Sequence, residues 1–476
     1  MRSAVIWRSG SQILAQMVQW AATFLVIRIL DPHDYGLFAM SQVVLVLLNM
    51  LNGYGLASGL IQRAEISRQQ IRQLFGMLIL VNLVLGISQL ALAPLAAAYY
   101  RQPIVADMLR VQALLYLTTP FIALPYALLS RAMDFRMQAR VNIVASVASA
   151  STALAGALAG LGVWTLVAAP LVLFGVRAIG MTIAARSLVW PSFNFRGAGD
   201  LARYGGVMAV GQLFWFVESQ ADVFIAGRAF SPHLLGIYTT GLFLTQIFVT
   251  KVVPPLNEVA FSAYARLQHE PGALGTAFAR GVRVVMVAGL PFYTGLAATA
   301  EPLVLTVLGP KWAETIPVVR LLAFAMPFMT LQVLFSPACD ASGRPGVSVR
   351  NGAVGALILG IAYLVGVQWG VTGLCWAWIA GYPLYTLLSA RRSLPVIGLS
   401  AAQLLDAISP SAIAAVAMAI IVTLADHILP PLAPVSRLAI LVLMGMASYA
   451  GWLWLFARPV IDELAQIIRR RPAQTA

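Results

Sequence analysis

Three basic residues, Arg8, Arg177 and Lys251, lie within long apolar stretches of the chain. A charged side chain at membrane depth is costly and by default marks a functional site. Cations at such positions could attract an anionic substrate. Two structural explanations stay open: the arginines could extend to the membrane surface, and Lys251 could form an ion pair with Glu218 at a comparable depth.

Polar side chains also recur at helical spacing. Near the N-terminus they are four, four and three residues apart and share one helix face: Arg8, Gln12, Gln16 and Gln19. A similar face later in the chain carries Gln212, Trp215, Ser219 and Asp222, with Glu218 beside it. Glu258 follows Lys251 by about two turns, and the prolines at 254 and 255 should break the helix between them. These stripes could line a polar cavity or join helices through hydrogen bonds.

The elements that carry these residues are predicted to be membrane-spanning helices. Of the 476 residues, 60% are hydrophobic and only 10% are charged, whereas soluble domains carry about 25% charged residues. The apolar runs are about 20 to 25 residues long, which is the length of a helix that crosses the hydrocarbon core. A barrel strand would show about ten residues of alternating pattern. We therefore predict an all-α polytopic membrane protein.

About fourteen transmembrane helices are expected. Their ranges are 4–29, 36–61, 73–98, 108–129, 141–162, 164–186, 204–228, 236–262, 281–308, 316–340, 347–368, 371–390, 404–429 and 435–457. The net charge of +14 is spread over the short intervening segments, which indicates membrane orientation and not nucleic-acid binding. Most of the basic residues fall on the N-terminal side, so the positive-inside rule places both termini in the cytoplasm.

A motif recurs about 200 residues along the chain. Arg28, Pro32, His33, Gly36 and Phe38 match Arg228, Pro232, His233, Gly236 and Tyr238 in register. Six predicted helices separate the copies, so the repeat is parallel. We predict two six-helix lobes, at 1–200 and 201–396, around a transporter-like cavity. Two additional helices at 397–458 and a basic amphipathic cytoplasmic tail at 459–476 follow.

Several short motifs carry a family resemblance. They are RILDPHDYG at 28–36, DVFIAGR at 222–228, GIY at 236–238, LGPKW at 308–312 and GR at 343–344. Their order and spacing resemble the multidrug/oligosaccharidyl-lipid/polysaccharide (MOP) exporter superfamily, and within it the polysaccharide-synthesis (Wzx-like) branch. The resemblance implies alternating access. It also implies a flippase that moves a polyprenyl-diphosphate-linked oligosaccharide from the inner to the outer leaflet of a bacterial plasma (inner) membrane, for exopolysaccharide or lipopolysaccharide biosynthesis.

Such a substrate assigns roles to the polar residues. The diphosphate would contact Arg8, Arg177 and Lys251, and the sugars would contact Gln12, Gln16, Trp20, Gln212 and Trp215. Charge balance, or coupling to H⁺ or Na⁺, would fall to Glu218, Asp222 and Glu258; Asp222 could instead cap its helix. A basic cluster at Arg131, Arg136 and Arg140 could gather the lipid headgroup, although topology-setting charge explains it equally well.

Two other functions agree less well with these residues. A drug/cation antiporter of the same superfamily would need an acidic lumen, whereas here three cations accompany three acids. A membrane polysaccharide polymerase or glycosyltransferase would need a sizeable outer loop or paired catalytic acids. Asp31 and Asp34 are such a pair, but the loop that holds them is short, so no enzyme is expected. No cofactor or metal site is expected either, because Cys339 and Cys375 lie in apolar segments without metal-ligand spacing. The expected partners are the lipid-linked oligosaccharide, the bilayer, a polymerase and a chain-length regulator, and no nucleic acid.

Overall fold

The computed structural model describes residues 2–51, 67–194, 199–268, 270 and 272–469, with side chains described outside 2–15, 199–213 and 464–469. Every regular element within these ranges is a helix, in agreement with the predicted all-α class. The chain forms two compact units, Met1–Gly236 and Ile237–Ala476. The predicted lobe boundaries stay a prediction.

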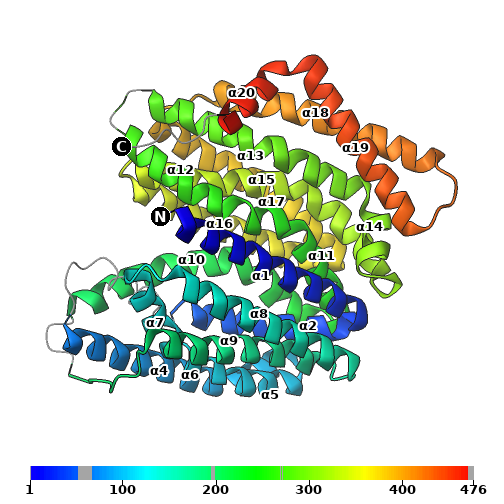
Figure 1. Ribbon diagram of the computed structural model, residues 1–476. Coiled ribbons are helices and arrows are strands. Elements are labelled where there is room, and N and C mark those ends of the chain that lie inside the picture. The colour runs from blue at the N-terminus through cyan, green and yellow to red at the C-terminus, as the bar shows by residue number, and fades with distance from the viewer. Residues whose placement is uncertain (1, 52–66, 195–198, 269, 271, 470–476) are drawn as a thin grey trace. The chain divides into compact units, whose positions relative to one another are not determined.

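The first unit consists of helices that pack against one another. Its helices are α1 (Arg2–Ile29), α2 (Pro32–Asn49), α4 (Arg68–Tyr100), α5 (Pro103–Gln112), α6 (Leu114–Thr118), α7 (Pro120–Arg131), α8 (Phe135–Leu158), α9 (Val163–Ala185) and α10 (Gly199–Ala229). α1 packs along α8, α8 along α9, and α7 along α9 (Figure 1). α2 contacts α4, α5, α9 and α10, and thereby connects the two ends of the unit's sequence.

The second unit begins at Ile237, within the second turn of α11. Its helices are α11 (Pro232–Lys251), α12 (Val253–Leu267), α13 (Ala273–Ala298), α14 (Ala300–Val307), α15 (Ile316–Ala341), α16 (Pro345–Gly366), α17 (Gly370–Ile397), α18 (Ala401–Ile428), α19 (Pro434–Phe456) and α20 (Arg458–Arg469). α15 lies between α13 and α17, while α18 covers α13 and in turn carries α19 (Figure 1).

The described helices agree with the predicted spans in position. Ten helical segments of the described chain are long and apolar enough to cross a membrane, and each coincides with one or two predicted helices. The predicted span 36–61 begins at Pro32, and its residues 52–61 lie outside the described chain.

Three predicted spans are broken: the breaks in 108–129 and 281–308 correct the predictions, whereas the break in 236–262 was expected from its prolines. The range 108–129 forms α5, α6 and α7, the range 236–262 breaks at Val252, and the range 281–308 breaks at Thr299. The breaks at Thr119, Val252 and Thr299 lie one to three residues before Pro120, Pro254 or Pro302, whereas the break at Ala113 has no proline beside it. Proline has no N–H to donate to the carbonyl four residues earlier, so the ladder of helical hydrogen bonds is interrupted there.

The first helical turn is fixed by side chains in both units. The Ser67 hydroxyl accepts a hydrogen bond from the Gln70 backbone N–H at 3.2 Å, and the Gln70 side chain accepts one from the Ser67 N–H at 3.0 Å. Ser400 and Gln403 repeat this arrangement at α18. These reciprocal bonds satisfy N–H groups that a helix otherwise leaves unpaired, and they fix where α4 and α18 begin.

The two copies of the repeated motif meet inside the first unit. Gly36 on α2 faces the backbone carbonyl of Pro232, and Gly236 faces the backbone carbonyl of Pro32. A Cβ atom at either glycine would overlap the facing carbonyl. The matched proline and glycine positions therefore serve one reciprocal backbone contact.

Candidate substrate site and apolar cavity

The predicted polar stripes lie on α1 and α10. Gln16 and Trp20 on α1 are half-buried, whereas Trp215 on α10 is 53% exposed. One turn further along α10, Glu218 is half-buried and Asp222 is buried, with 1% of its surface exposed. The side chains of Arg8, Gln12 and Gln212 lie outside the described residues. The opposition of the two stripes across a cavity stays a prediction.

Arg177 lies within the membrane-spanning part of α9. Eight residues separate it from the end of the helix at Ala185, a rise of about 12 Å. The side chain is half-buried, between the buried Ala178 and the 65% exposed Ile179. This position is compatible with both earlier interpretations, contact with substrate and extension toward the membrane surface.

Lys251 is the last residue of α11, and Glu258 lies in the second turn of α12. Both side chains are exposed on the second unit. The predicted break between them is confirmed, at Val252, two residues before the first proline. Glu218 belongs to the first unit, so the suggested Lys251–Glu218 ion pair stays a prediction.

The basic cluster lies where α7 turns into α8. Arg131 ends α7, and Arg136 and Arg140 are four residues apart on the first turns of α8, so they share a helix face. Asp134 caps the start of α8, because its side chain accepts a hydrogen bond from the backbone N–H of Met137 at 3.1 Å. Arg131 is half-buried, and the other two arginines are exposed. The structure thus brings these three predicted residues together at one end of two neighbouring helices.

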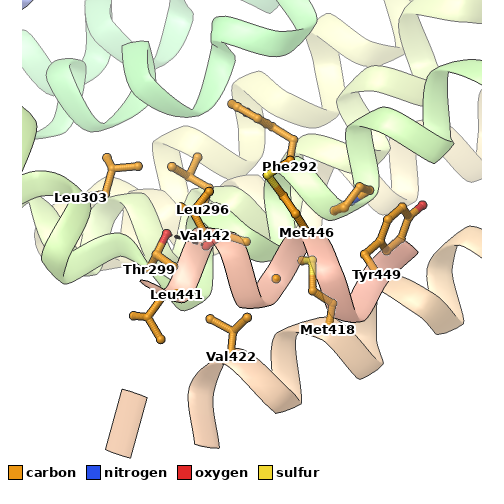
Figure 2. A pocket seen from close by; sticks show the side chains of 13 residues that line it. Phe292, Leu296, Thr299, Leu303, Met418, Val422, Leu441, Val442, Met446 and Tyr449 are labelled. Atoms are coloured by element: carbon orange, nitrogen blue, oxygen red, sulfur yellow. Dashed lines mark hydrogen bonds between the residues drawn. The ribbon is translucent and has the colours of Figure 1, made fainter. Parts of the chain in front are cut away.

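An apolar cavity of about 500 Å³ lies in the second unit, and sequence reasoning did not identify it. It is bounded by α13, α14, α18 and α19 (Figure 2), and its lining residues are Pro291, Phe292, Gly295, Leu296, Thr299, Leu303, Met418, Val422, Leu441, Val442, Gly445, Met446 and Tyr449. Its volume is within the range of small-molecule sites, about 300–1,000 Å³. The available signal was weak: Gly295 and Gly445 line the cavity, but α13 and α19 contain other glycines that do not.

The cavity offers no unsatisfied polar side chain to a ligand. The Thr299 hydroxyl donates to the Gly295 carbonyl at 2.8 Å, and the Tyr449 hydroxyl donates to the Val287 carbonyl at 2.9 Å. The other lining side chains are apolar, and none is acidic or basic. An uncharged hydrocarbon chain fits this lining, whereas a cation would leave its hydration shell without compensation.

A charge network lies one helical turn from the cavity. The Arg437 guanidinium donates two hydrogen bonds to Asp426, at 2.6 Å from Nε to Oδ1 and 2.8 Å from Nη2 to Oδ2. Glu301 is 3.6 Å from Arg437 and 3.9 Å from Arg320, measured between nitrogen and oxygen. Because Asp426 follows Val422 and Arg437 precedes Leu441 by four residues, this network connects α14, α15, α18 and α19 beside one end of the cavity.

A protein-family model shows to which family the chain belongs. The model described as "Polysaccharide biosynthesis protein" matches residues 25–317, which is more than half of the 476 residues. The chain belongs to this polysaccharide biosynthesis family. Membership confirms the polysaccharide-synthesis part of the resemblance stated from the motifs, and with its ten membrane-length apolar segments the described chain is a multi-pass membrane protein of this family.

Curated members of the polysaccharide biosynthesis family align over most of the chain. The succinoglycan biosynthesis transport protein ExoT of Rhizobium meliloti (strain 1021) is 26% identical over 67% of this chain, and the match spans 65% of ExoT. The lipopolysaccharide biosynthesis protein WzxC of Escherichia coli (strain K12) is 23% identical over 79% of this chain and 77% of its own length. The teichuronic acid biosynthesis protein TuaB of Bacillus subtilis (strain 168) is 23% identical over 77% of each chain.

Solved structures of other proteins share the fold of this chain. The lipid II flippase MurJ, in an inward closed conformation, superposes with a TM-score of 0.78 at 11% identity, over 96% of this chain and 100% of MurJ. An inward-facing multidrug resistance MATE transporter of the MOP superfamily gives 0.61 at 15% identity, over 83% and 98%. The predicted fold class is confirmed by these matches.

Proposed function

We propose that the protein is a flippase that moves a polyprenyl-diphosphate-linked oligosaccharide repeat unit from the inner to the outer leaflet, for exopolysaccharide or lipopolysaccharide biosynthesis. Membership of the polysaccharide biosynthesis family carries this proposal. The relatives named for succinoglycan, lipopolysaccharide and teichuronic acid biosynthesis support it, because each of those products is a polysaccharide or contains one.

The apolar cavity supports a substrate that carries a hydrocarbon chain. Each buried CH₂ group contributes about 0.8 kcal/mol relative to water, but the surrounding lipid is also apolar. A cavity of about 500 Å³ without free polar groups therefore holds part of a prenyl chain through packing, with little hydrophobic gain over the bilayer. Weak binding of this kind suits a carrier that must release its substrate.

The polar ends of the substrate are assigned to the residues predicted from the sequence. Arg8, Arg177 and Lys251 attract the diphosphate, because arginine and lysine form charge-assisted hydrogen bonds with phosphate oxygens. The sugars contact the stripe of Gln12, Gln16, Trp20, Gln212 and Trp215. The acids Glu218, Asp222 and Glu258 balance these cations or couple transport to H⁺ or Na⁺, and the cluster at Arg131, Arg136 and Arg140 gathers the headgroup on the cytoplasmic side.

This function places the chain in a bacterial plasma membrane with both termini in the cytoplasm. The cytoplasmic placement of the termini follows from the excess of arginine and lysine in segments on the N-terminal side. A polymerase that extends the exported repeat unit and a chain-length regulator are the partners this pathway requires.

Deletion of the gene in its own host tests the proposal. The surface polysaccharide should fall, and the lipid-linked repeat unit should accumulate in lipid extracts, as measured by mass spectrometry. The wild-type gene on a plasmid should restore both quantities. An unchanged pool of lipid-linked sugar in the deletion strain would contradict the proposal.

A cation antiporter is the second candidate, and one observation favours it. Asp222 on α10 is buried, with 1% of its surface exposed, and a buried carboxylate is suited to exchange of a cation for a proton. The same deletion strain distinguishes the candidates: an antiporter predicts retention of a cationic dye in the cell, with the lipid-linked pool unchanged.

A further inference from the structure

Residues 187–194, which we call the strap, follow α9 and lie along the start of α4. Three hydrogen bonds fix the strap in place. The Ser192 N–H donates to the Arg72 carbonyl at 2.9 Å, and the Arg72 Nε donates to the Trp190 carbonyl at 3.0 Å. The Gln73 side chain donates to the Asn194 carbonyl at 2.7 Å. The strap therefore has a defined course although it contains no helix.

One side of the strap is docked on the first unit. Val189 packs against a buried cluster composed of Leu74, Phe75, Leu78, Ala123, Leu124 and Ala127. Gly76 faces the backbone of Ser192, and a Cβ atom there would overlap the Ser192 carbonyl. This close approach of two backbones holds the strap against α4.

The other side of the strap projects three large apolar side chains outward. Leu188 is 81% exposed, Trp190 is 83% exposed and Phe193 is 57% exposed. The hydrogen bonds of the strap fix the course of the backbone that carries these side chains. Exposure of large apolar side chains to water is unfavourable, so an apolar environment is expected on that side.

The surroundings of the strap are basic. Arg68, Arg72 and Arg186 are exposed on the adjoining ends of α4 and α9, and the segments 67–75 and 185–194 contain no Asp or Glu. The 33 residues of α4 span about 50 Å, which exceeds the hydrocarbon thickness of about 30 Å. An upright α4 therefore extends beyond the hydrocarbon, and the exposed Arg68, Arg72 and Arg186 favour headgroup depth for the end at which the strap lies.

We infer that the strap is a membrane-surface anchor that binds anionic lipid headgroups. Leu188, Trp190 and Phe193 enter the boundary between headgroups and acyl chains, where tryptophan is favoured. The neighbouring arginines contact lipid phosphates, because an anionic membrane surface attracts nearby basic residues. This anchor is independent of the transported substrate.

A spin label at the strap measures its depth directly. Leu188→Cys leaves Trp190 and Phe193 in place, and the native Cys339 and Cys375 are fully buried and protected from labelling. The labelled protein is reconstituted into phosphatidylcholine vesicles with or without an equal amount of phosphatidylglycerol. Electron paramagnetic resonance then compares collisions of the label with oxygen, which partitions into lipid, and with a water-soluble nickel chelate.

The anchor predicts more collisions with oxygen than with nickel, and a further shift toward oxygen when phosphatidylglycerol is present. Trp190→Ser should shift the label toward nickel, whereas Trp190→Tyr should retain the depth, because tyrosine is also favoured at the interface. Arg68→Gln with Arg186→Gln should remove the effect of phosphatidylglycerol. A label that collides mainly with nickel would contradict the anchor, and a label shielded from both reagents would show that protein covers the strap.

Discussion

Gly36 lies against the backbone carbonyl of Pro232, and the reciprocal contact joins Gly236 to Pro32. The two motifs are about 200 residues apart in the sequence. The proline carbonyl of each motif lies against the glycine of the other. Both proline positions begin a helix, α2 and α11. The repeat read from the sequence therefore corresponds to a physical contact between its two copies.

Replacement of either glycine should destabilise the protein. Gly36→Ala places a methyl group against a backbone carbonyl that cannot rotate away, so a loss of about 1–3 kcal/mol in the free energy of unfolding is expected. Gly236→Ala should have a similar effect. Thermal unfolding in detergent measures it, and Gly175→Ala is the matched control, because its Cβ would meet no atom within 4 Å. Equal melting temperatures for Gly36→Ala and Gly175→Ala would contradict the contact.

Filling the apolar cavity should slow transport without unfolding the protein. Val442→Trp places a large ring at a cavity-lining position that is 44% exposed. Leu443→Trp, next to it on α19, is the control, since Leu443 is 66% exposed and does not line the cavity. The expected result is a flipping rate at least several-fold lower for Val442→Trp alone. Equal rates for the two variants would exclude the cavity from the transport path.

The Arg437–Asp426 pair should stabilise the α18–α19 hairpin. Its side chains are 26% and 10% exposed, and removal of a charged hydrogen-bond partner there should cost about 1–3 kcal/mol. Arg437→Gln therefore lowers the melting temperature. Arg110→Gln serves as the control, because the Arg110–Asp107 pair is 54% and 56% exposed and exposed pairs contribute about 0–1 kcal/mol. A larger loss for the exposed pair would overturn this ranking.

The docking of α20 should depend on pH. Glu463 is bound by Arg280 at 2.7 Å and by Arg283. Burial alone would raise the pKa of Glu463, but the hydrogen bonds from Arg283 and Arg280 outweigh it and hold the pKa below its ordinary value of 4.5. Because the pKa of Glu463 is lowered by docking, the two arginines stabilise the docked state at pH values above the pKa of the undocked carboxyl. This contribution is lost as the pH falls through the pKa of the docked carboxyl.

Hydrogen exchange of α20 measures that dependence. Exchange in 458–469 should accelerate as the pH falls below 4.5, after correction for the intrinsic effect of pH on exchange. Glu463→Gln should show fast exchange already at neutral pH, whereas the neighbouring Asp462→Asn should behave like wild type. A Glu463→Gln protein with wild-type protection at neutral pH would show that the two arginines do not hold the helix.

Much of the fold was predictable, because each transmembrane helix is encoded by its own apolar run. The break after Lys251 was predictable as well, since it depends on the local effect of Pro254. The breaks at Pro120 and Thr299 were missed, because a single proline is compatible with a continuous kinked helix. α15 contains Pro327 and Pro337 without a break.

The site was predictable only in part. Asp222 was noted as part of the family motif at 222–228, but its burial was not predicted. The clustering of Arg131 and Arg136 follows from their position at one turn. The apolar cavity depends on four helices that are far apart in sequence, and its glycines do not indicate which way they face. Arg437 illustrates the same limit, because its partner Asp426 lies on the other helix of a hairpin.

Reconstituted flipping tests the central claim most directly. The protein is placed in proteoliposomes that contain an undecaprenyl-diphosphate oligosaccharide, and the glycan that reaches the opposite leaflet is measured with an impermeant sugar-oxidising reagent. Wild type should make the glycan accessible on both leaflets, and Lys251→Ala should slow this by about tenfold, equivalent to about 1.4 kcal/mol of lost phosphate attraction. Wild-type vesicles that expose no more glycan than empty vesicles, but that expel a cationic dye, would contradict the flippase and establish the antiporter.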